Sequence, residues 1–302
     1  MGGGTGCFDG GCGIVYRLQP PQRAVGNILG GYTETVLYRF TGAADGGWPE
    51  GADLLFDGSG NLYGTAFMGG SSSQCQGGCG VAYKLTHSNG SWTESVVHSF
   101  GDGTDGQYPW AGLIFDASGA LYGTTTSGGT DRKGTVYQLL PSGSGWIEQV
   151  LYSFQNLSDG YDSYGGLISD QAGNFYGATC CGGPLGGGAV FQLNDTSGWT
   201  LTTLHNFAGE GVYGSLVMDA AGNLYGSTGE GGAYNSGTVF KLSPGSGGWT
   251  YTSLYDFCPG GWPCTDGAFP SGSLAIDAAG NLYGTTSDGG ANGGGAVFEV
   301  TP

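Results

Sequence analysis

Cysteines are the residues of this chain with the most definite chemistry, and there are eight of them. They come close together in the sequence, with spacings C-x4-C, C-x3-C, CC and C-x5-C, which differ from the C-x2-C pairs of zinc sites. An even number of closely spaced cysteines favours local disulfides in an oxidising compartment. We therefore predict short bridges and an extracellular or cell-surface location, with the connectivity left open. The cysteines are Cys7, Cys12, Cys75, Cys79, Cys180, Cys181, Cys258 and Cys264.

The adjacent pair Cys180 and Cys181 is the most distinctive of these. Bridged to each other, the two residues would form a strained ring that presents a rigid apolar platform; two free or separately paired thiols also fit the sequence.

Carboxylates are the next group that could do chemistry, and the 24 acidic residues mostly follow a repeat. A glycosidase needs two unlike carboxylates about 5 to 10 Å apart, and Glu50 and Asp53 are candidates that nothing marks as a pair. No nucleophile elbow, P-loop or HExxH motif occurs. We predict no catalytic, cofactor or metal site, and keep a polysaccharide-cleaving enzyme as the alternative. Five acids precede the first strand of a repeat: Asp45, Asp105, Asp159, Glu210 and Asp266.

Aromatic residues stand in the same segments that precede the first strands. Their flat apolar faces with polar edges could stack on sugar rings. The competing interpretation is that they are wedges between repeats. The candidate ligand contacts are Trp48, Trp110, Tyr161, Tyr164, Tyr213, Trp262 and Phe269.

These residues are positioned by an internal repeat. The octapeptide DAAGNLYG occurs at Asp219 and again at Asp277, and variants of it begin at Asp57, Asp116 and Asp170. In D-x-x-G the Asp can accept backbone N–H groups of a tight turn, and the Gly can adopt the positive φ that closes it. We therefore interpret the five aspartates as turn formers rather than catalytic groups.

Each repeat contains four short apolar segments of strand length, separated by turn residues. Four-stranded units repeated about every 50 residues predict an all-β fold, a β-propeller of about five blades; a linear β-solenoid has shorter rungs. We expect one propeller domain over 1–302, with strands three and four in 1–40 and five repeat units in 41–302. Near the ends of the fourth strands, His98 and His205 take the place held elsewhere by Tyr38, Tyr152 and Tyr255.

The strand count is 21, one more than five blades need. We expect the N-terminal fourth strand, Thr33 to Phe40, to close the ring by pairing with the third strand of the C-terminal unit. The surplus strand is then Gly13, Ile14, Val15, Tyr16, Arg17 and Leu18, which is either a fifth, outermost strand of the closing blade or free to pair with another subunit. Six blades, or a part of a longer array, are the alternatives.

The phrases GNLYGT, GGGAVFEVTP and WTESVVHSF resemble the tandem GloVer repeat of bacterial surface proteins, the choice-of-anchor group. The resemblance extends over nearly the whole chain. It implies secreted or cell-surface proteins, and it assigns no activity to individual residues.

Composition narrows the range of partners. The net charge of −17, with only seven Lys and Arg, argues against nucleic acid and anionic membranes, and no apolar run is long enough for a membrane-spanning helix. The remaining predicted partners are the chain itself, by head-to-tail strand pairing, and a polysaccharide. We predict a non-enzymatic structural or adhesive surface module without cofactors, which could form filaments. The alternative is a propeller that binds or cleaves polysaccharide with its cysteine-bearing face.

Overall fold

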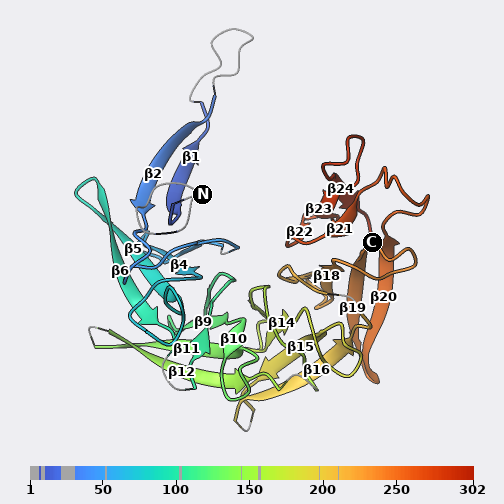
Figure 1. Cartoon of the computed structure of the whole chain (residues 1–302). Helices are drawn as coiled ribbons and strands as arrows, with labels where there is room; N and C mark the ends of the chain where they lie inside the picture. Colours follow the sequence, from blue (N-terminus) through green and yellow to red (C-terminus); the bar gives the residue numbers. More distant parts are fainter. Residues whose placement is uncertain are drawn as a thin grey trace.

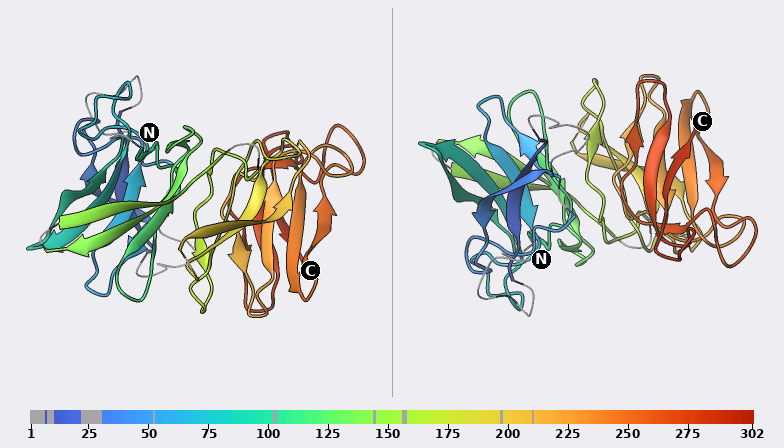
Figure 2. Two further views of the ribbon diagram at one scale, coloured as in Figure 1. Left: turned by 90° about the horizontal axis from the view of Figure 1, so that it is seen from below. Right: turned by 90° about the horizontal axis from the view of Figure 1, so that it is seen from above.

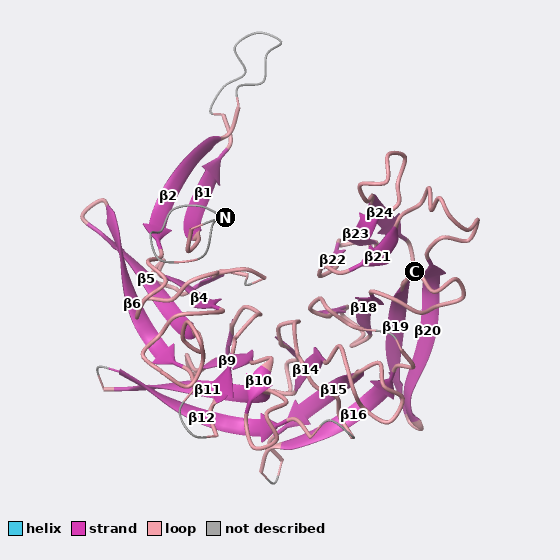
Figure 3. Cartoon of the chain, in the orientation of Figure 1, coloured by secondary structure: helices cyan, strands magenta, loops and turns pink. Residues whose placement is uncertain are grey.

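The computed structural model is all-β and has the blade architecture predicted from the repeats (Figure 1). It describes residues 7, 11–21, 31–51, 53–101, 104–143, 145–155, 158–196, 198–209 and 211–302. Strands and loops make up all of this part of the chain (Figure 3). Among the described residues no helix is long and apolar enough to cross a membrane.

Five four-stranded antiparallel sheets follow one another around the molecule. Blade 1 holds β3 (Leu55–Phe56), β4 (Leu62–Ala66), β5 (Val81–Ser88) and β6 (Ser91–Ser99). Blade 2 holds β8 (Ile114–Phe115), β9 (Leu121–Thr124), β11 (Thr135–Ser142) and β12 (Gly145–Ser153). Blade 3 holds β13 (Ile168–Ser169), β14 (Phe175–Ala178), β15 (Ala189–Asn194) and β16 (Thr200–Asn206). Blade 4 holds β17 (Val217–Met218), β18 (Leu224–Thr228), β19 (Thr238–Gly245) and β20 (Gly248–Asp256).

The last sheet, the C-terminal unit, holds β21 (Ala268–Pro270), β22 (Ala275–Ile276), β23 (Leu282–Asp288) and β24 (Val297–Val300). Its strands β22, β23 and β24 are a first, second and third strand of the repeat, and β21 is a short addition. A separate N-terminal hairpin pairs β1 (Ile14–Gln19) with β2 (Thr33–Arg39). In the loops of blade 2, β7 (Gly106–Gln107) pairs with β10 (Ser127–Gly128).

The repeated octapeptide builds the turn between the first and second strands. Asp219 accepts the backbone N–H groups of Ala221 and Asn223, both at 2.9 Å, the side-chain amide of Asn223 at 2.7 Å, and the Tyr225 hydroxyl at 2.9 Å. Burial would raise the pKa of Asp219, but these donors outweigh it and lower the pKa. Gly222 closes the turn with a φ of 80°. The interpretation of these aspartates as turn formers is confirmed.

The final glycine of the octapeptide is required by packing within the blade. A Cβ at Gly226 would lie 2.6 Å from the ring of Phe240 on the neighbouring strand β19. Leu224, two residues before Gly226, is buried in the same apolar cluster as Phe240. A small residue is therefore needed wherever an aromatic side chain of the third strand crosses the second strand.

Apolar clusters that join consecutive blades form the core. Tyr63 of blade 1, for example, packs with Leu113, Leu121 and Tyr137 of blade 2. Equivalent clusters join blade 2 to blade 3, blade 3 to blade 4, and blade 4 to the C-terminal unit. Each repeat buries its faces on its neighbours, as a propeller requires.

The predicted closure of the ring differs from the structure. In the described ladders β2 pairs with β1 and β24 pairs with β23, and β2 does not pair with β24. The surplus strand, predicted as Gly13 to Leu18, is observed as β1 and occupies the edge of β2 that β24 would need. Only residues 20–32 separate β1 from β2, whereas β2 and β24 lie near opposite ends of the chain, so loop-closure entropy favours the pairing with β1. The hairpin and the C-terminal unit consequently stand apart at the two ends of the row of blades (Figures 1 and 2).

Candidate functional site

One face of the molecule carries both the cysteines and the predicted ligand-contact aromatics. Backbone hydrogen bonds tie the loops before the first strands to the loops after the second strands: Gly47 N–H donates to Met68 O at 2.9 Å, and Tyr161 N–H donates to Cys181 O at 2.8 Å. These contacts place the two sets of loops beside each other.

All eight cysteines form disulfides, and each bridge joins near neighbours in the sequence. The predicted local bridges are confirmed, including the adjacent pair. The bonds are Cys7–Cys12, Cys75–Cys79, Cys180–Cys181 and Cys258–Cys264. Four disulfides indicate an oxidising environment.

Five aromatic rings on this face follow one another in contact, and we call them the aromatic row. Tyr108 stacks on Phe67 with ring centroids 4.9 Å apart, and Phe67 meets Trp110 edge-on at 5.3 Å. Trp110 in turn contacts Tyr164 at 5.6 Å, and Tyr164 contacts Tyr213 at 5.9 Å. The row therefore passes from blade 1 to the loop that enters blade 4, and it brings together three of the seven predicted aromatics.

Trp110, Tyr164 and Tyr213 occupy one equivalent position, three residues before the first core leucine of their repeats. The same position is Gly51 in the first full repeat and Ser271 in the last. Two repeats fold with glycine or serine at this position, so the blade structure does not require an aromatic residue there. This finding argues against the interpretation of these three rings as obligatory wedges between blades.

Gly51 makes room for the row. Its ideal Cβ would lie 2.3 Å from Nε1 of Trp110, closer than any real contact. The indole therefore lies directly on the Gly51 backbone, which fixes the orientation of the ring. The Trp110 side chain remains partly exposed, as do Tyr164 and Tyr213.

The other predicted aromatics lie apart from the row in the contacts between described residues. Trp262 is 64% exposed in the Cys258–Cys264 loop, with its ring 6.3 Å from that of Phe269. Tyr161 lies under the ammonium of Lys133, with Nζ 4.2 Å from the ring centroid. Trp48 is partly buried, and its Nε1 has no hydrogen-bond partner among the residues that the structure describes.

A polar group adjoins the row in blade 3. The carboxylate of Asp162 and the sulfurs of Cys180 and Cys181 lie within 4.8 Å of one another. The sulfurs are joined in a disulfide, so they are not thiolate metal ligands. Burial raises the pKa of Asp162, and the positive charge of Lys133 partly opposes that rise. The pKa of Tyr164 is raised by burial and by the nearby Asp162 charge.

Several of these residues share an unusual backbone conformation. Trp48, Tyr108, Asp162 and Phe269 have φ values of 56°, 61°, 54° and 58°. At Tyr108, for example, this conformation lets the backbone connect two consecutive repeats. Its N–H donates to Cys79 O at 2.8 Å, and its carbonyl O accepts Thr126 N–H at 3.1 Å. The positive φ is thus held by the junction between blades.

Sequence reasoning missed Phe67, Tyr108, Asp162 and Lys133. A signal was present for Tyr108, because its segment GQYPWAG aligns with the segments around Trp48 and Phe269. Phe67 and Lys133 follow second strands in other repeats, and only the blade contacts bring them to the site.

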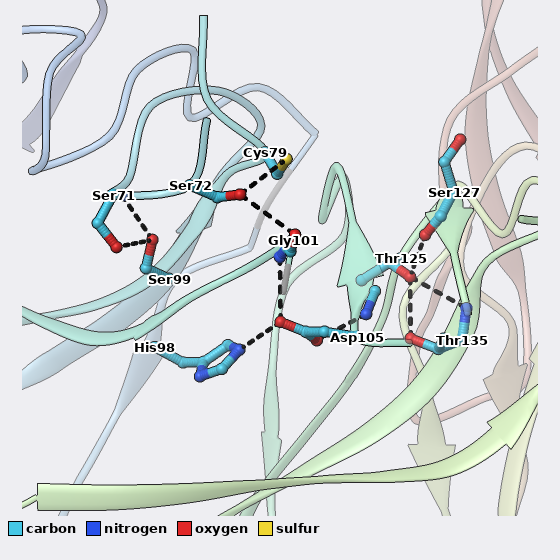
Figure 4. A network of polar contacts seen from close by, with 11 residues as sticks. Ser71, Ser72, Cys79, His98, Ser99, Gly101, Asp105, Thr125, Ser127 and Thr135 are labelled. Carbon is cyan, nitrogen blue, oxygen red and sulfur yellow. Dashed lines mark hydrogen bonds and ion pairs between the residues drawn. The ribbon is translucent and has the colours of Figure 1, made fainter. Parts of the chain in front are cut away.

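The imidazole of His98 is a structural group. Its Nε2 lies 2.9 Å from Oδ2 of Asp105, which also accepts the Gly101 N–H at 3.0 Å (Figure 4). Tyr38 and Tyr255 donate in the same way to Asp45 and Asp266. The interpretation of His98 as a substitute for tyrosine is confirmed. Glu210, the corresponding acid of another repeat, lies outside the described residues.

The structure does not bury Glu50 and Asp53, the two carboxylates considered for a polysaccharide-cleaving enzyme, as a pair. Glu50 and Asp53 are both exposed in the loop before β3. Asp53 lines a cavity of about 280 Å³ at the inner ends of the first strands, together with Leu54, Leu113, Leu167 and Leu216.

Comparisons with known proteins find similar structures but no family. No family model matches the chain, and no curated protein matches it. A gluconolactonase from Xanthomonas campestris is 15% identical, with 89% of this chain and 75% of that chain covered and a TM-score of 0.49. A putative gluconolactonase is 14% identical over 82% of this chain and 72% of that chain, with a TM-score of 0.47.

A third solved structure is an ulvan lyase of polysaccharide lyase family PL25, which is 13% identical over 77% of this chain and 65% of that chain, with a TM-score of 0.44. Likenesses at this level do not extend to function. The resemblance to GloVer repeats has no matching family model behind it and stays a prediction.

Proposed function

We propose that the chain is a carbohydrate-binding propeller and that the aromatic row is its sugar platform. The observation that carries the proposal is the equivalent placement of Trp110, Tyr164 and Tyr213 in three consecutive repeats, with glycine and serine at that position in the flanking repeats. Since the fold tolerates small residues there, function is the better explanation of three linked rings.

The chemistry of the row fits a saccharide. A sugar ring offers an apolar face of C–H groups and a polar edge of hydroxyls, and partly exposed tyrosine and tryptophan rings match both. Asp162 and Lys133 supply a charged acceptor and a charged donor close to Tyr164 and Tyr161. Because the row extends over several blades, an oligosaccharide chain fits it better than a single sugar.

The test begins with a glycan array and continues with isothermal titration of the ligands found. We expect Trp110→Ala and Tyr164→Ala each to weaken binding about tenfold or more, since an aromatic contact contributes roughly 1 kcal/mol beyond its buried area. Tyr32→Ala is the matched control: Tyr32 is 67% exposed and lies in the hairpin loop, away from the row. An array without ligands, or full affinity in Trp110→Ala, would overturn the proposal.

A second candidate function is the self-assembling structural or adhesive surface module expected from the sequence. It is favoured by exposed apolar side chains at the two open ends of the row of blades. Phe56 at one end is 64% exposed, and Val297 at the other is 82% exposed. Electron microscopy of the unreduced protein over a range of concentrations tests it: regular filaments support assembly, and single particles at every concentration exclude it. Both candidates place the protein outside the cell, in accord with its four disulfides.

A further inference from the structure

Three of the four interfaces between consecutive described sheets repeat one contact, in which the tyrosine of the LYG or FYG sequence in one blade covers a first-strand residue of the next. Tyr63 lies edge-on against Phe115 with ring centroids 5.2 Å apart. Tyr176 and Met218 share the cluster between blades 3 and 4, and Tyr225 and Ile276 share the next one. Between blades 2 and 3 the first-strand position is Ser169, and Tyr122 stacks instead on Phe175 of the second strand, with ring centroids 4.3 Å apart.

At each end of the row of blades only one of the two residues of this contact is present. Phe56 occupies in blade 1 the position that Phe115 occupies in blade 2, and it is 64% exposed because the described part of the N-terminal segment, β1 and β2, contains no second strand to cover it. Tyr283 occupies the tyrosine position in the C-terminal unit, and no described blade follows that unit. One end thus lacks a tyrosine, and the other has one in excess.

The surrounding residues also show that each end is not covered by a described neighbouring blade. Val297 in β24 is 82% exposed, whereas the equivalent Val136, Val190 and Val239 are fully buried. At the other end, Tyr16 and Leu18 of β1 are 50% and 52% exposed, whereas Tyr137 and Leu139 are fully buried. A groove of about 510 Å³ lies there, lined by Tyr16, Leu37, Leu54, Phe56, Leu62 and Trp92.

We infer that this groove receives the C-terminal unit of a second copy of the chain, with Tyr283 of that copy covering Phe56. The inference rests on the second candidate function and is independent of carbohydrate binding. The internal interfaces show what fills the equivalent space, namely the first and second strands of a preceding blade, and β22 and β23 are such strands. A second copy is the occupant because the two ends of one chain lie apart (Figure 1). Contacts of this head-to-tail type continue from copy to copy unless a ring closes.

The hairpin of one copy and the C-terminal unit of the other would together form one four-stranded blade, and one of their five repeat strands has to detach for this blade to form. The hairpin brings a third and a fourth strand, and the incoming unit brings a first, second and third, so β1 and β24 compete for one place. The β1 ladder has six residue pairs and its Val15 is 4% exposed, whereas the β24 ladder has four pairs. We therefore expect β24 to detach and β23 to pair with β1, whose inner edge is free in the described ladders.

The first test is sedimentation velocity over a range of protein concentrations. We expect the wild type to form oligomers and Phe56→Glu to stay monomeric, with an unchanged near-ultraviolet circular dichroism spectrum because Phe56 is already mostly exposed. Leu185→Glu is the matched control, at a leucine 57% exposed in blade 3, and should assemble like the wild type. Deletion of residues 296–302, which removes β24, should leave assembly intact. Loss of assembly in this variant would overturn the expected replacement of β24 by β1 at the edge of β23.

Crosslinking identifies the partner. Mixed single variants Phe56→Cys and Tyr283→Cys should give a covalent dimer under mild oxidation, and a disulfide formed only within the monomeric double variant would overturn the second copy as occupant. Assembly that persists in Phe56→Glu would refute this contact and leave the self-assembly function standing. A wild type that is monomeric throughout would refute both.

Discussion

The imidazole of His98 lies 2.9 Å from the buried carboxylate of Asp105, at the place where other repeats set a tyrosine hydroxyl against an aspartate. Tyr38 donates to Asp45 at 3.0 Å, and Tyr255 donates to Asp266 at 2.6 Å. The fold therefore needs a donor on an aromatic ring at this position, and either residue type supplies it.

Replacement of His98 should depend on whether the donor is kept. We expect His98→Ala to lower the free energy of unfolding by about 1 to 3 kcal/mol, because the Asp105 carboxylate, 8% exposed, loses a hydrogen-bond partner. His98→Tyr, which restores the residue of the other repeats, should stay within about 0.5 kcal/mol of the wild type. Urea unfolding at constant pH measures both. Equal losses in the two variants would contradict this role.

Glu148 should make stability depend on pH. It lies on β12 opposite Leu139, and its buried Oε1 has no hydrogen-bond partner in the described part of the chain. Burial together with the Asp105 charge raises its pKa to about 7. Because this folded-state pKa exceeds the ordinary glutamate pKa of 4.5, the folded protein binds more protons than the unfolded chain between these values, and its stability should fall as the pH rises from about 4.5 to 7. Urea midpoints at pH 5 and pH 7.5 measure the difference.

Glu148→Gln should reduce this slope, since the amide is neutral at every pH. Glu94, whose pKa is also raised to about 7 by burial and by the Asp45 charge, should account for the part that remains. Glu34 holds the same position in β2 but is exposed, and Glu34→Gln is the matched control. An unchanged pH profile in Glu148→Gln would exclude Glu148 as a source.

Gly226 should tolerate no side chain. The Cβ of Gly226→Ala would lie 2.6 Å from the Phe240 ring, and overpacking of this kind costs about 1 to 3 kcal/mol. Gly247→Ala is the control, since its Cβ would meet nothing within 4 Å and its φ is not positive. Thermal unfolding compares the two. If both variants melt at the wild-type temperature, the packing explanation of LYG is wrong.

The disulfides should shape loops more than they hold the blades together. Loss of the Cys258–Cys264 bridge, which closes a short loop, should lower the free energy of unfolding by only about 2 kcal/mol. The double variant Cys258→Ala and Cys264→Ala should keep the far-ultraviolet circular dichroism of the wild type. A spectrum of an unfolded chain would show instead that the bridge is required for folding.

Features that depend on nearby residues could be predicted from the sequence. The turn at Asp219 uses donors two, four and six residues away, so the octapeptide by itself specifies it. The local disulfides and the equivalence of His98 with tyrosine were predictable for the same reason. Repetition of such local units also determined the class of fold, because four short strands cannot bury their apolar faces except on a like neighbour.

The tertiary structure alone decided which distant residues meet. Phe67, Trp110, Tyr164 and Tyr213 come from four repeats, and their contacts depend on the angle at which each blade packs on the next. The 21 repeat strands expected from the sequence are observed, together with the short strands β7, β10 and β21, but the expected pairing of β2 with β24 was wrong. The structure pairs β1 with β2 instead, since a hairpin loses less chain entropy than a closure between the two ends of the chain, and so leaves both ends of the row open.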